Sequence, residues 1–200
     1  MTIRGPLTIL AVLVVVCATA AFAQEDAFQV RYAANLNIGD SVINITNAGT
    51  QNVNGALTNI CVNVYTFSPD EQLISCCSCV VTPNALVSLS ARSDLISNTL
   101  TPAVPNSIVV KLLATAGAPC NAAVVDPANL AAGMVAWGTT LHATPTAGTY
   151  AVTETQFANK GLSPVELARI TSFCGFIQAN GSGYGICRSC RLGGQGAVRQ

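Results

Sequence analysis

The sequence predicts a mainly β protein: an immunoglobulin-like β-sandwich stapled by disulfides, with one C-terminal α-helix. Three observations support this fold class. Short segments rich in Val, Ile and Thr recur between turns that contain Gly, Pro and Asn. Eight of the nine cysteines follow an apolar N-terminal leader, as in exported proteins with disulfides. Helical spacing of apolar residues occurs late in the chain, at residues 163–180.

Residues 1–23 have the pattern of a cleaved signal peptide. Arg4 supplies a positive charge, an apolar run follows, and Ala21-Phe22-Ala23 is a small-x-small cleavage site. The apolar run is shorter than the roughly 20 residues that a membrane span needs. We therefore expect export through the Sec pathway, a secreted chain of residues 24–200 that forms a single domain, and no membrane association after cleavage. An uncleaved anchor is the alternative.

Charged residues make up only 9% of the sequence, against about 25% in an average domain. Loss of Arg4 with the signal leaves eight basic and nine acidic residues, so the secreted chain carries a net charge of about −1. Without a basic stripe, nucleic acid and anionic membranes are not expected partners. A polar surface with few charges lacks the repulsion that keeps copies apart, which favours self-association.

The N-terminal segment of the secreted chain, residues 24–34, contains a predicted strand. Phe28, Val30 and Tyr32 fall on one face of it, and the polar side chains between them fall on the other. Two roles are open to this strand. It either pairs within its own sheet or inserts into the sheet edge of a neighbouring subunit.

Residues 59–83 predict a cysteine-rich hairpin. Its first strand alternates between two faces, one with Val62 and Val64 and the other with Cys61, Asn63 and Tyr65. Residues 68–71 have turn chemistry, and the return strand ends in the motif CCSC. We expect the valine face to enter the sandwich core and the Tyr65 face to be covered by the C-terminal helix.

The other elements follow in order. Further strands are expected at residues 41–46, 85–90, 107–115, 132–142 and 149–154. Two long connections separate some of them, residues 92–106, with one helical turn near Asp94, and residues 116–131. A capping box with Pro at the first helical position begins the helix at Ser163, and Asn180-Gly181 ends it in a left-handed cap. The polar residues 191–200 are expected to be loose.

The cysteines of the secreted chain are compatible with three kinds of site: a disulfide framework, a zinc site, or a redox CxxC. They are Cys61, Cys76, Cys77, Cys79, Cys120, Cys174, Cys187 and Cys190. An even number in an exported chain favours disulfides. CCxC is a poor zinc knuckle, and the Gly-Gly that follows Cys190 cannot form the helix that activates a redox CxxC. We therefore expect no metal and no other cofactor.

Strand geometry limits the disulfide pairs. A four-residue turn places Cys61 opposite Ser78 and on the same face as Cys76, whereas a loop one residue longer or shorter places it opposite Cys77 or Cys79. Adjacent residues point to opposite faces, so Cys76 and Cys77 are not expected to pair with each other. The hairpin holds more cysteines than it can pair internally. We expect at least one bridge to the C-terminal unit.

Catalytic groups are sparse. His142 is the only histidine, which excludes His-rich metal sites, and a lone histidine at a strand end is more often structural than catalytic. Asp70 and Glu71 are adjacent in a turn, whereas paired catalytic carboxylates converge from separate elements. The sequence contains no phosphate loop, dinucleotide fingerprint or calcium loop. The chain is therefore not expected to be an enzyme.

Five residues are candidate sites of glycosylation. Asn44 and Asn180 begin formal N-glycosylation sequons. Thr82, Thr101 and Thr144 each precede a proline and are candidate O-glycan acceptors. Intact mass of the secreted protein tests all five.

Two stretches resemble a group of small exported proteins of environmental bacteria. The first is ICVNVYTFSPDEQLISCCSC with SNTLTP and VVKLLAT after it, and the second is FCGFIQANGSGYGICRSC. The group carries no established activity to transfer. Similar exported β proteins include subunits of extracellular fibres, and the resemblance implies a structural role of that kind.

The leading expectation is a secreted, non-enzymatic structural protein, a subunit of an extracellular fibre or surface assembly whose main partner is another copy of itself. The alternative is a secreted binding module that recognises glycan or protein through residues 92–106 and 116–131. In that alternative Trp137 and Tyr150 form a sugar platform, although packing in the core is the expected place for both.

Overall fold

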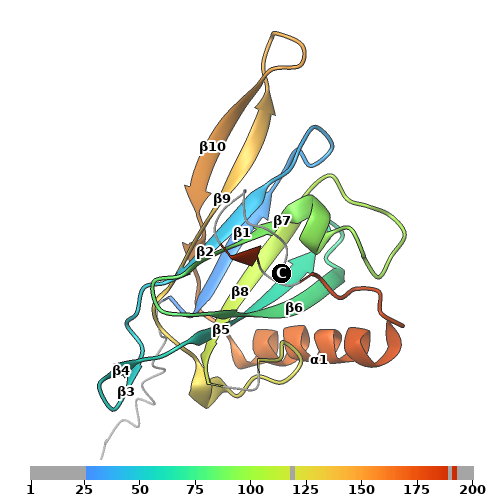
Figure 1. The fold of residues 1–200 in the computed structure, drawn as a ribbon. Helices are drawn as coiled ribbons and strands as arrows, with labels where there is room; N and C mark the ends of the chain where they lie inside the picture. The colour runs from blue at the N-terminus through green and yellow to red at the C-terminus, as the bar shows by residue number, and fades with distance from the viewer. Residues whose placement is uncertain (1–25, 118–119, 189–190, 193–200) are drawn as a thin grey trace, which may run out of the picture.

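The protein is a sandwich of two five-stranded antiparallel sheets, with a single long helix on the outer face of one of them (Figure 1). A computed structural model describes residues 26–117, 120–188 and 191–192. The predicted mainly β fold, stapled by disulfides and carrying one C-terminal α-helix, is confirmed. The signal segment 1–23 lies outside the described residues.

The first sheet, sheet A, has the strand order β11-β1-β8-β5-β6. Its strands are β11 (Ala158–Asn159), β1 (Phe28–Ala33), β8 (Ile108–Ala116), β5 (Ile60–Phe67) and β6 (Leu73–Val81). β8 and β5 occupy its interior. Both are rich in β-branched residues, and every residue of β5 is buried. The strand expected at residues 107–115 is therefore β8, in the interior of sheet A.

The second sheet, sheet B, has the strand order β10-β9-β2-β7-β12. Its strands are β10 (Tyr150–Gln156), β9 (Met134–Ala143), β2 (Val42–Asn47), β7 (Leu86–Ser90) and β12 (Arg191–Leu192). The expectation that residues 191–200 are loose is wrong at its start, because residues 191–192 pair with Ser88 and Val87 of β7. Residues 193–200 lie outside the described residues.

Short elements fill the connections. β3 (Asn52–Val53) and β4 (Ala56–Leu57) form a small hairpin, η1 (Ala91–Leu95) is a single helical turn at the expected place near Asp94, and η2 (Pro127–Asn129) lies in the long loop after β8. After β10, the buried Phe157 bridges the two sheets: its N–H donates to Ala136 O at 2.9 Å, and β11 then joins sheet A.

Helix α1 (Pro164–Asn180) begins as its sequence predicts. Ser163 Oγ accepts a hydrogen bond from Glu166 N at 3.1 Å, and Pro164 takes the first helical position. The predicted left-handed cap is wrong: Gly181 has φ −74° and its N–H donates to Ile177 O. Glycine is needed there for space, because a Cβ would lie 2.5 Å from Tyr184 O and 2.6 Å from Ile177 O.

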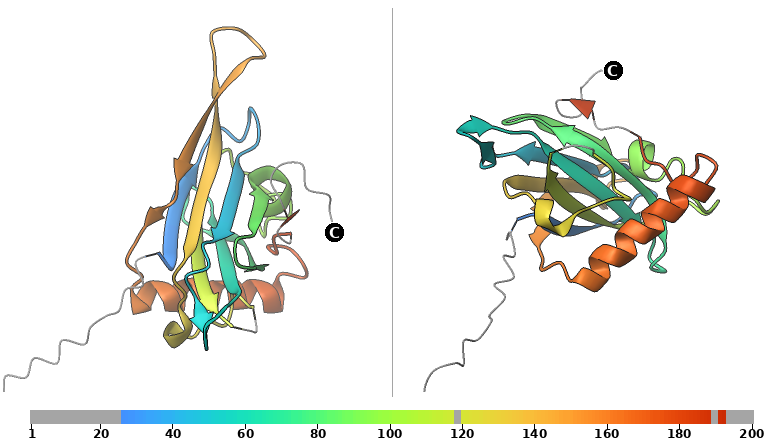
Figure 2. Two further views of the ribbon diagram at one scale, coloured as in Figure 1. Left: turned by 60° about the vertical axis from the view of Figure 1, so that its left-hand side comes forward. Right: turned by 90° about the horizontal axis from the view of Figure 1, so that it is seen from below.

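Two hydrophobic cores result from this three-layer arrangement, which Figure 2 shows from two further sides. Val62 and Val64 of β5 point into the core between the sheets, as expected. Tyr65 points the other way, into the core between sheet A and α1, where Ile170 and Ile177 of the helix are buried. Lys111 of β8 also faces the helix and forms a 2.5 Å ion pair with Glu166.

Candidate functional site

Three described disulfides connect the hairpin of β5 and β6 to other parts of the chain. Cys76–Cys174 ties β6 to α1, Cys77–Cys187 ties β6 to the segment after the helix, and Cys61–Cys120 ties β5 to the loop after β8. Cys79 is also disulfide-bonded. The expected bridge from the hairpin to the C-terminal unit is therefore confirmed twice over.

The predicted register of the hairpin is wrong by two residues. Cys61 lies opposite Val80, rather than opposite Ser78, Cys77 or Cys79. Residues 68–72 make the loop, one residue longer than the plain turn, and a bulge between Thr66 and Phe67 shifts the pairing once more. Because the total shift is even, each side chain keeps its predicted face.

The zinc site and the redox CxxC both need free cysteine thiols, and the described disulfides remove several of them. Cys76 and Cys77 are in separate disulfides, so they are not thiolate ligands for zinc. Cys187 bonds Cys77, so it does not form the redox pair that the CxxC spacing suggests. Cys190 lies outside the described residues. In the described chain no group of three or more His, Cys, Asp or Glu residues is placed to hold a metal ion.

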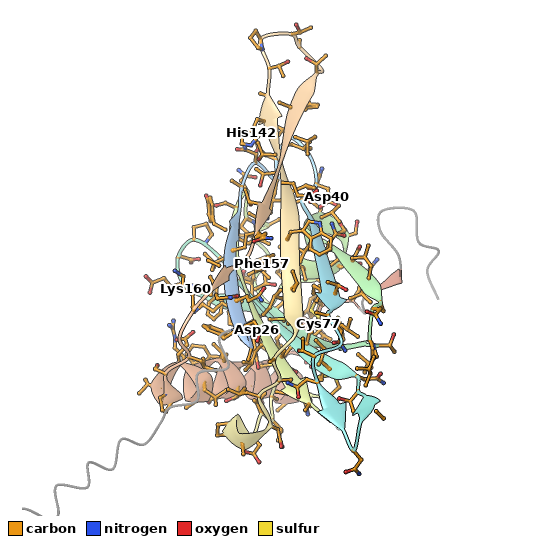
Figure 3. The ribbon with its side chains drawn as sticks, turned by 90° about the vertical axis from the view of Figure 1, so that its left-hand side faces the viewer. Asp26, Asp40, Cys77, His142, Phe157 and Lys160 are labelled. Carbon is orange, nitrogen blue, oxygen red and sulfur yellow. A yellow bond between two sulfur atoms is a disulfide. The ribbon has the colours of Figure 1, made fainter. Side chains whose placement is uncertain are left out.

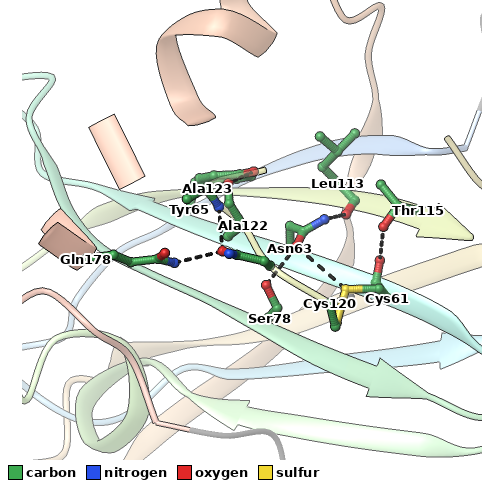
Figure 4. Close-up of a disulfide and its surroundings, with 11 residues drawn as sticks. Cys61, Asn63, Tyr65, Ser78, Leu113, Thr115, Cys120, Ala122, Ala123 and Gln178 are labelled. Atoms are coloured by element: carbon green, nitrogen blue, oxygen red, sulfur yellow. Dashed lines mark hydrogen bonds between the residues drawn. A yellow bond between two sulfur atoms is a disulfide. The ribbon is translucent and has the colours of Figure 1, made fainter. Parts of the chain in front are cut away.

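The loop that contains Cys120 is anchored at several points (Figure 4). The buried Tyr65 donates its hydroxyl to Ala122 O at 2.7 Å, and burial raises the pKa of that phenol. Gln178 of α1 donates to Asn121 Oδ1 at 3.0 Å. Helix, loop and sheet A thus form one interlocked unit.

The polar groups singled out for catalysis lie far from one another in the fold. His142, labelled in Figure 3, is on β9 in the projecting hairpin, and its Nε2 lies 2.8 Å from Thr153 Oγ1. Asp70 and Glu71 are exposed in the β5–β6 loop. This loop follows a different strand pair in sheet A, so the carboxylates and the imidazole do not form one site.

The candidate glycosylation residues differ in accessibility. Asn180 at the end of α1 and Thr82 after β6 are exposed. Asn44 on β2 is half-buried, and its Oδ1 accepts from Ser88 Oγ at 2.6 Å. Thr101 is half-buried, and so is Thr144, whose hydroxyl bonds within the β9–β10 turn.

The N-terminal strand pairs inside its own chain. β1 lies between β8 and β11, and six of its residues pair with β8. Phe28 is buried beneath α1, Val30 is half-buried and Tyr32 is 60% exposed. This is one of the two roles that the sequence left open, and it leaves no edge of β1 unpaired along its first half.

The most exposed structural element is the hairpin of β9 and β10, which projects beyond the body of the sandwich (Figures 1 and 2). We call its distal part the arm, residues 139–154. β10 is the edge strand of sheet B, it pairs with β9 alone within the described chain, and all seven of its residues are exposed. Its sequence, YAVTETQ, has strong β propensity and a single charge, at Glu154.

A buried arginine fixes the base of the arm. Arg31 of β1 is 6% exposed and donates to Thr155 Oγ1 at 3.0 Å, to Thr140 Oγ1 at 2.8 Å and to Ser41 Oγ at 3.3 Å. Desolvation lowers the pKa of its guanidinium. Three hydroxyls from β10, β9 and the β1–β2 connection therefore meet one cation from the other sheet, which sets the direction of the arm.

Comparison with known proteins gives no match: no family model, no curated protein and no solved structure matches the chain. In the described part of the chain, no helix is both long enough and apolar enough to cross a membrane.

Proposed function

We propose that this protein is a secreted, non-enzymatic structural protein that assembles with copies of itself through the edge of β10. The supporting observation is the bare edge: seven exposed residues in a strand that pairs on one side only. Roughly half of the backbone N–H and C=O groups in such a strand point away from its neighbour and are open to another strand.

Natural proteins protect long edge strands with lysine, proline, bulges or a covering segment. β10 contains no lysine and no proline, and its pairing with β9 runs from Tyr150 to Gln156 without a register shift. The sparse charge of the whole chain removes a further barrier to association. An edge of this kind pairs with an extended strand of a second molecule by strand addition.

The edge of β10 suits this role better than the N-terminal strand. Donation of β1 to a neighbour would first break its six residue pairs with β8 and the contacts of Phe28 beneath α1. β10 needs no such exchange. Antiparallel pairing of β10 with its own copy is a two-fold contact that closes at a dimer, so a fibre or surface layer needs a second contact as well.

Helix α1 offers an apolar surface for that second contact. Val165, Phe173 and Phe176 are 79%, 43% and 60% exposed on its outer side. The disulfides and the signal-like leader support a secreted location, where such a framework persists.

Sedimentation of the secreted chain, residues 24–200, over a range of concentrations tests the proposal. We expect dimers or larger species, and we expect the double variant Ala151→Lys with Thr153→Lys to sediment as a monomer because two cations then repel across the paired edges. The matched control is Val104→Lys with Val124→Lys, two exposed loop positions outside the arm. A wild-type monomer at all concentrations, or equal association in both double variants, contradicts the proposal.

A further inference from the structure

The outer face of sheet B, on the side away from sheet A, carries the only tryptophan of the chain. Along β9, Met134 and Ala136 point into the core between the sheets, so Trp137 and Thr139 point outward. Trp137 is half-buried and lies opposite Asn44 of β2 and Gln156 of β10. The expectation that Trp137 packs in the core is therefore wrong.

Tyr150 is not part of the same surface patch. It lies on the outer side of β10 opposite Ala143, six residues from the Gln156 that faces Trp137. At about 3.3 Å per residue this separates the two aromatic side chains by about 20 Å along the hairpin. The two rings therefore do not form the single sugar platform that the sequence suggested.

A depression of about 380 Å³ lies on this face, and the lining residue nearest to Trp137 along β9 is Thr139, two positions further on. Its polar lining comes from two strands, β7 and β9, and from the turn before β2: Asp40, Ser88, Ser90 and Thr139. Its apolar lining is Val42, Leu141 and Val152. Thr139 lines it from a position two residues after Trp137 on the same face of β9, so the tryptophan and the depression lie on the same side of sheet B.

The polar groups of the depression are held in place. Asp40 Oδ1 accepts from Ser41 N at 2.8 Å and from Arg92 N at 3.0 Å, while Ser90 donates its hydroxyl to Oδ2. Ser88 Oγ donates to Asn44 Oδ1 at 2.6 Å. With Oδ1 engaged by Ser88, the Nδ2 of Asn44 is available to donate to a ligand beside Trp137.

The lining also excludes several ligand classes. Among the described residues that line the depression, Asp40 is the only charged one. A phosphate, sulfate or uronic acid ligand would meet its carboxylate and no cation among those residues. The mixture of fixed hydroxyls, one carboxylate, an amide and a narrow apolar strip suits a ligand that is neutral, rich in hydroxyl groups and apolar on its ring faces.

We infer that the outer face of sheet B binds a neutral polysaccharide, with a pyranose ring stacked on Trp137 and the next ring in the depression beside it. An aromatic ring offers a flat apolar surface to the C–H groups of a sugar, and the Ser, Thr, Asn and Asp groups exchange hydrogen bonds with its hydroxyls. This inference does not depend on self-assembly. Pairing of β10 edges would leave the same face open and place two copies of it side by side, which raises avidity.

Fluorescence of Trp137 gives a direct test, since the chain has no other tryptophan. The secreted chain is titrated with four neutral hexasaccharides, from cellulose, amylose, laminarin and chitin, and with oligogalacturonate as the anionic comparison. We expect a saturable change of emission with at least one neutral sugar and none with oligogalacturonate. No change with any neutral sugar, or binding of the anionic sugar alone, overturns the inference.

Affinity electrophoresis in gels that contain the matching polysaccharide then locates the site. We expect Trp137→Ala to weaken binding at least about tenfold, which equals about 1.4 kcal/mol, and Asn44→Ala to weaken it less. Tyr184→Ala, at an exposed aromatic position after α1, is the control and should bind as wild type. Trp137→Phe retains an aromatic ring if the alanine variant folds poorly. Wild-type affinity in both Trp137 variants overturns the inference.

Discussion

The two sheets end in long edge strands that are treated in opposite ways. β6 closes sheet A with cysteines whose disulfides reach α1 and the segment after it, through Cys76–Cys174 and Cys77–Cys187. Other chain segments also cover its backbone: Cys76 N donates to Gly185 O at 2.9 Å and Leu100 N donates to Ile74 O at 3.0 Å. β10 closes sheet B with seven exposed residues and no covering segment in the described chain.

The difference shows how a chain with few charges handles strand edges. Lysine is a common protection for an edge strand, but this chain is only 9% charged. At β6, disulfides and the backbone of neighbouring segments protect the edge in place of lysine. At β10 the same hydrogen-bonding capacity is left open, which is the reason to assign association to that edge.

The largest expected effect is loss of the bond that holds the helix over sheet A. The double variant Cys76→Ala with Cys174→Ala removes a bridge between residues 98 positions apart and should lower the free energy of unfolding by about 4 kcal/mol. Chemical denaturation measures the loss. Val165→Ala on the exposed side of the same helix is the control, with an expected change below about 0.5 kcal/mol. Equal stability of the two variants would show that the bridge does not stabilise the closed edge.

A smaller effect is expected at the base of the open edge. Gly138→Ala introduces a Cβ that would lie 2.8 Å from Arg31 Nη1 and 3.1 Å from Val42 O, so the cation or the strand must move. We expect a loss of about 1–3 kcal/mol in thermal or chemical unfolding. Gly161→Ala is the matched control, because a Cβ there meets no atom within 4 Å. If both glycine variants unfold alike, Arg31 does not pack as tightly as its contacts indicate.

Tyr65→Phe tests the packing of α1 and the Cys120 loop against sheet A. It removes the hydroxyl that donates to Ala122 O, and we expect a loss of about 1–2 kcal/mol near pH 7. Burial raises the pKa of Tyr65 above its ordinary value of about 10. The unfolded chain therefore releases this proton first as the pH rises above 10, and wild-type stability should fall there.

The phenylalanine variant has no such proton, so its stability should fall less steeply above pH 10. Tyr184→Phe, at a tyrosine that is 59% exposed, serves as the control and should follow the wild-type pH profile. Parallel profiles of wild type and Tyr65→Phe would contradict the assignment of the alkaline loss to this group.

Much of the fold could be predicted from local patterns. The alternation in β5 assigns Val62 to one core and Tyr65 to the other, and the capping box at Ser163 marks the first turn of α1. Both depend on neighbours in sequence. The two cysteines Cys76 and Cys77 could also be assigned to opposite faces of one strand, and they bond different partners.

The exposed edge of β10 and the outward direction of Trp137 depend on contacts between residues far apart in the sequence, so local patterns could not predict them. Which strand lies at an edge follows from the order of all strands in the sheet, and β10 looks no different in sequence from a paired strand. Trp137 is the largest apolar residue of β9, and its size predicts that it faces the core. The smaller face with Met134 and Ala136 faces the core, so Trp137 lies on the outer side. The bulge after Thr66 leaves no clear sequence signal, yet it shifts the hairpin register.

The smallest expected effect on stability gives the sharpest comparison of the two edges. Val80 of β6 is 55% exposed, and all residues of β10 are exposed, so lysine at either edge should change the free energy of unfolding by less than about 1 kcal/mol, including the loss of the exposed Thr153–His142 hydrogen bond. Association should separate them. Ala151→Lys with Thr153→Lys should abolish it, whereas Val80→Lys should leave it intact because other segments already bond the backbone of the same edge at Ile74 and Cys76.

Sedimentation of the two variants at matched concentration measures this contrast, and chemical denaturation confirms that both remain folded. If Val80→Lys also dissociates the assembly, then the edge of β6 takes part in the contact despite its cover. If only Val80→Lys does so, β10 is not the assembling edge. Dissociation by the arm variant alone, at unchanged stability, is the outcome that follows from one edge closed by disulfides and the other left open to a second copy.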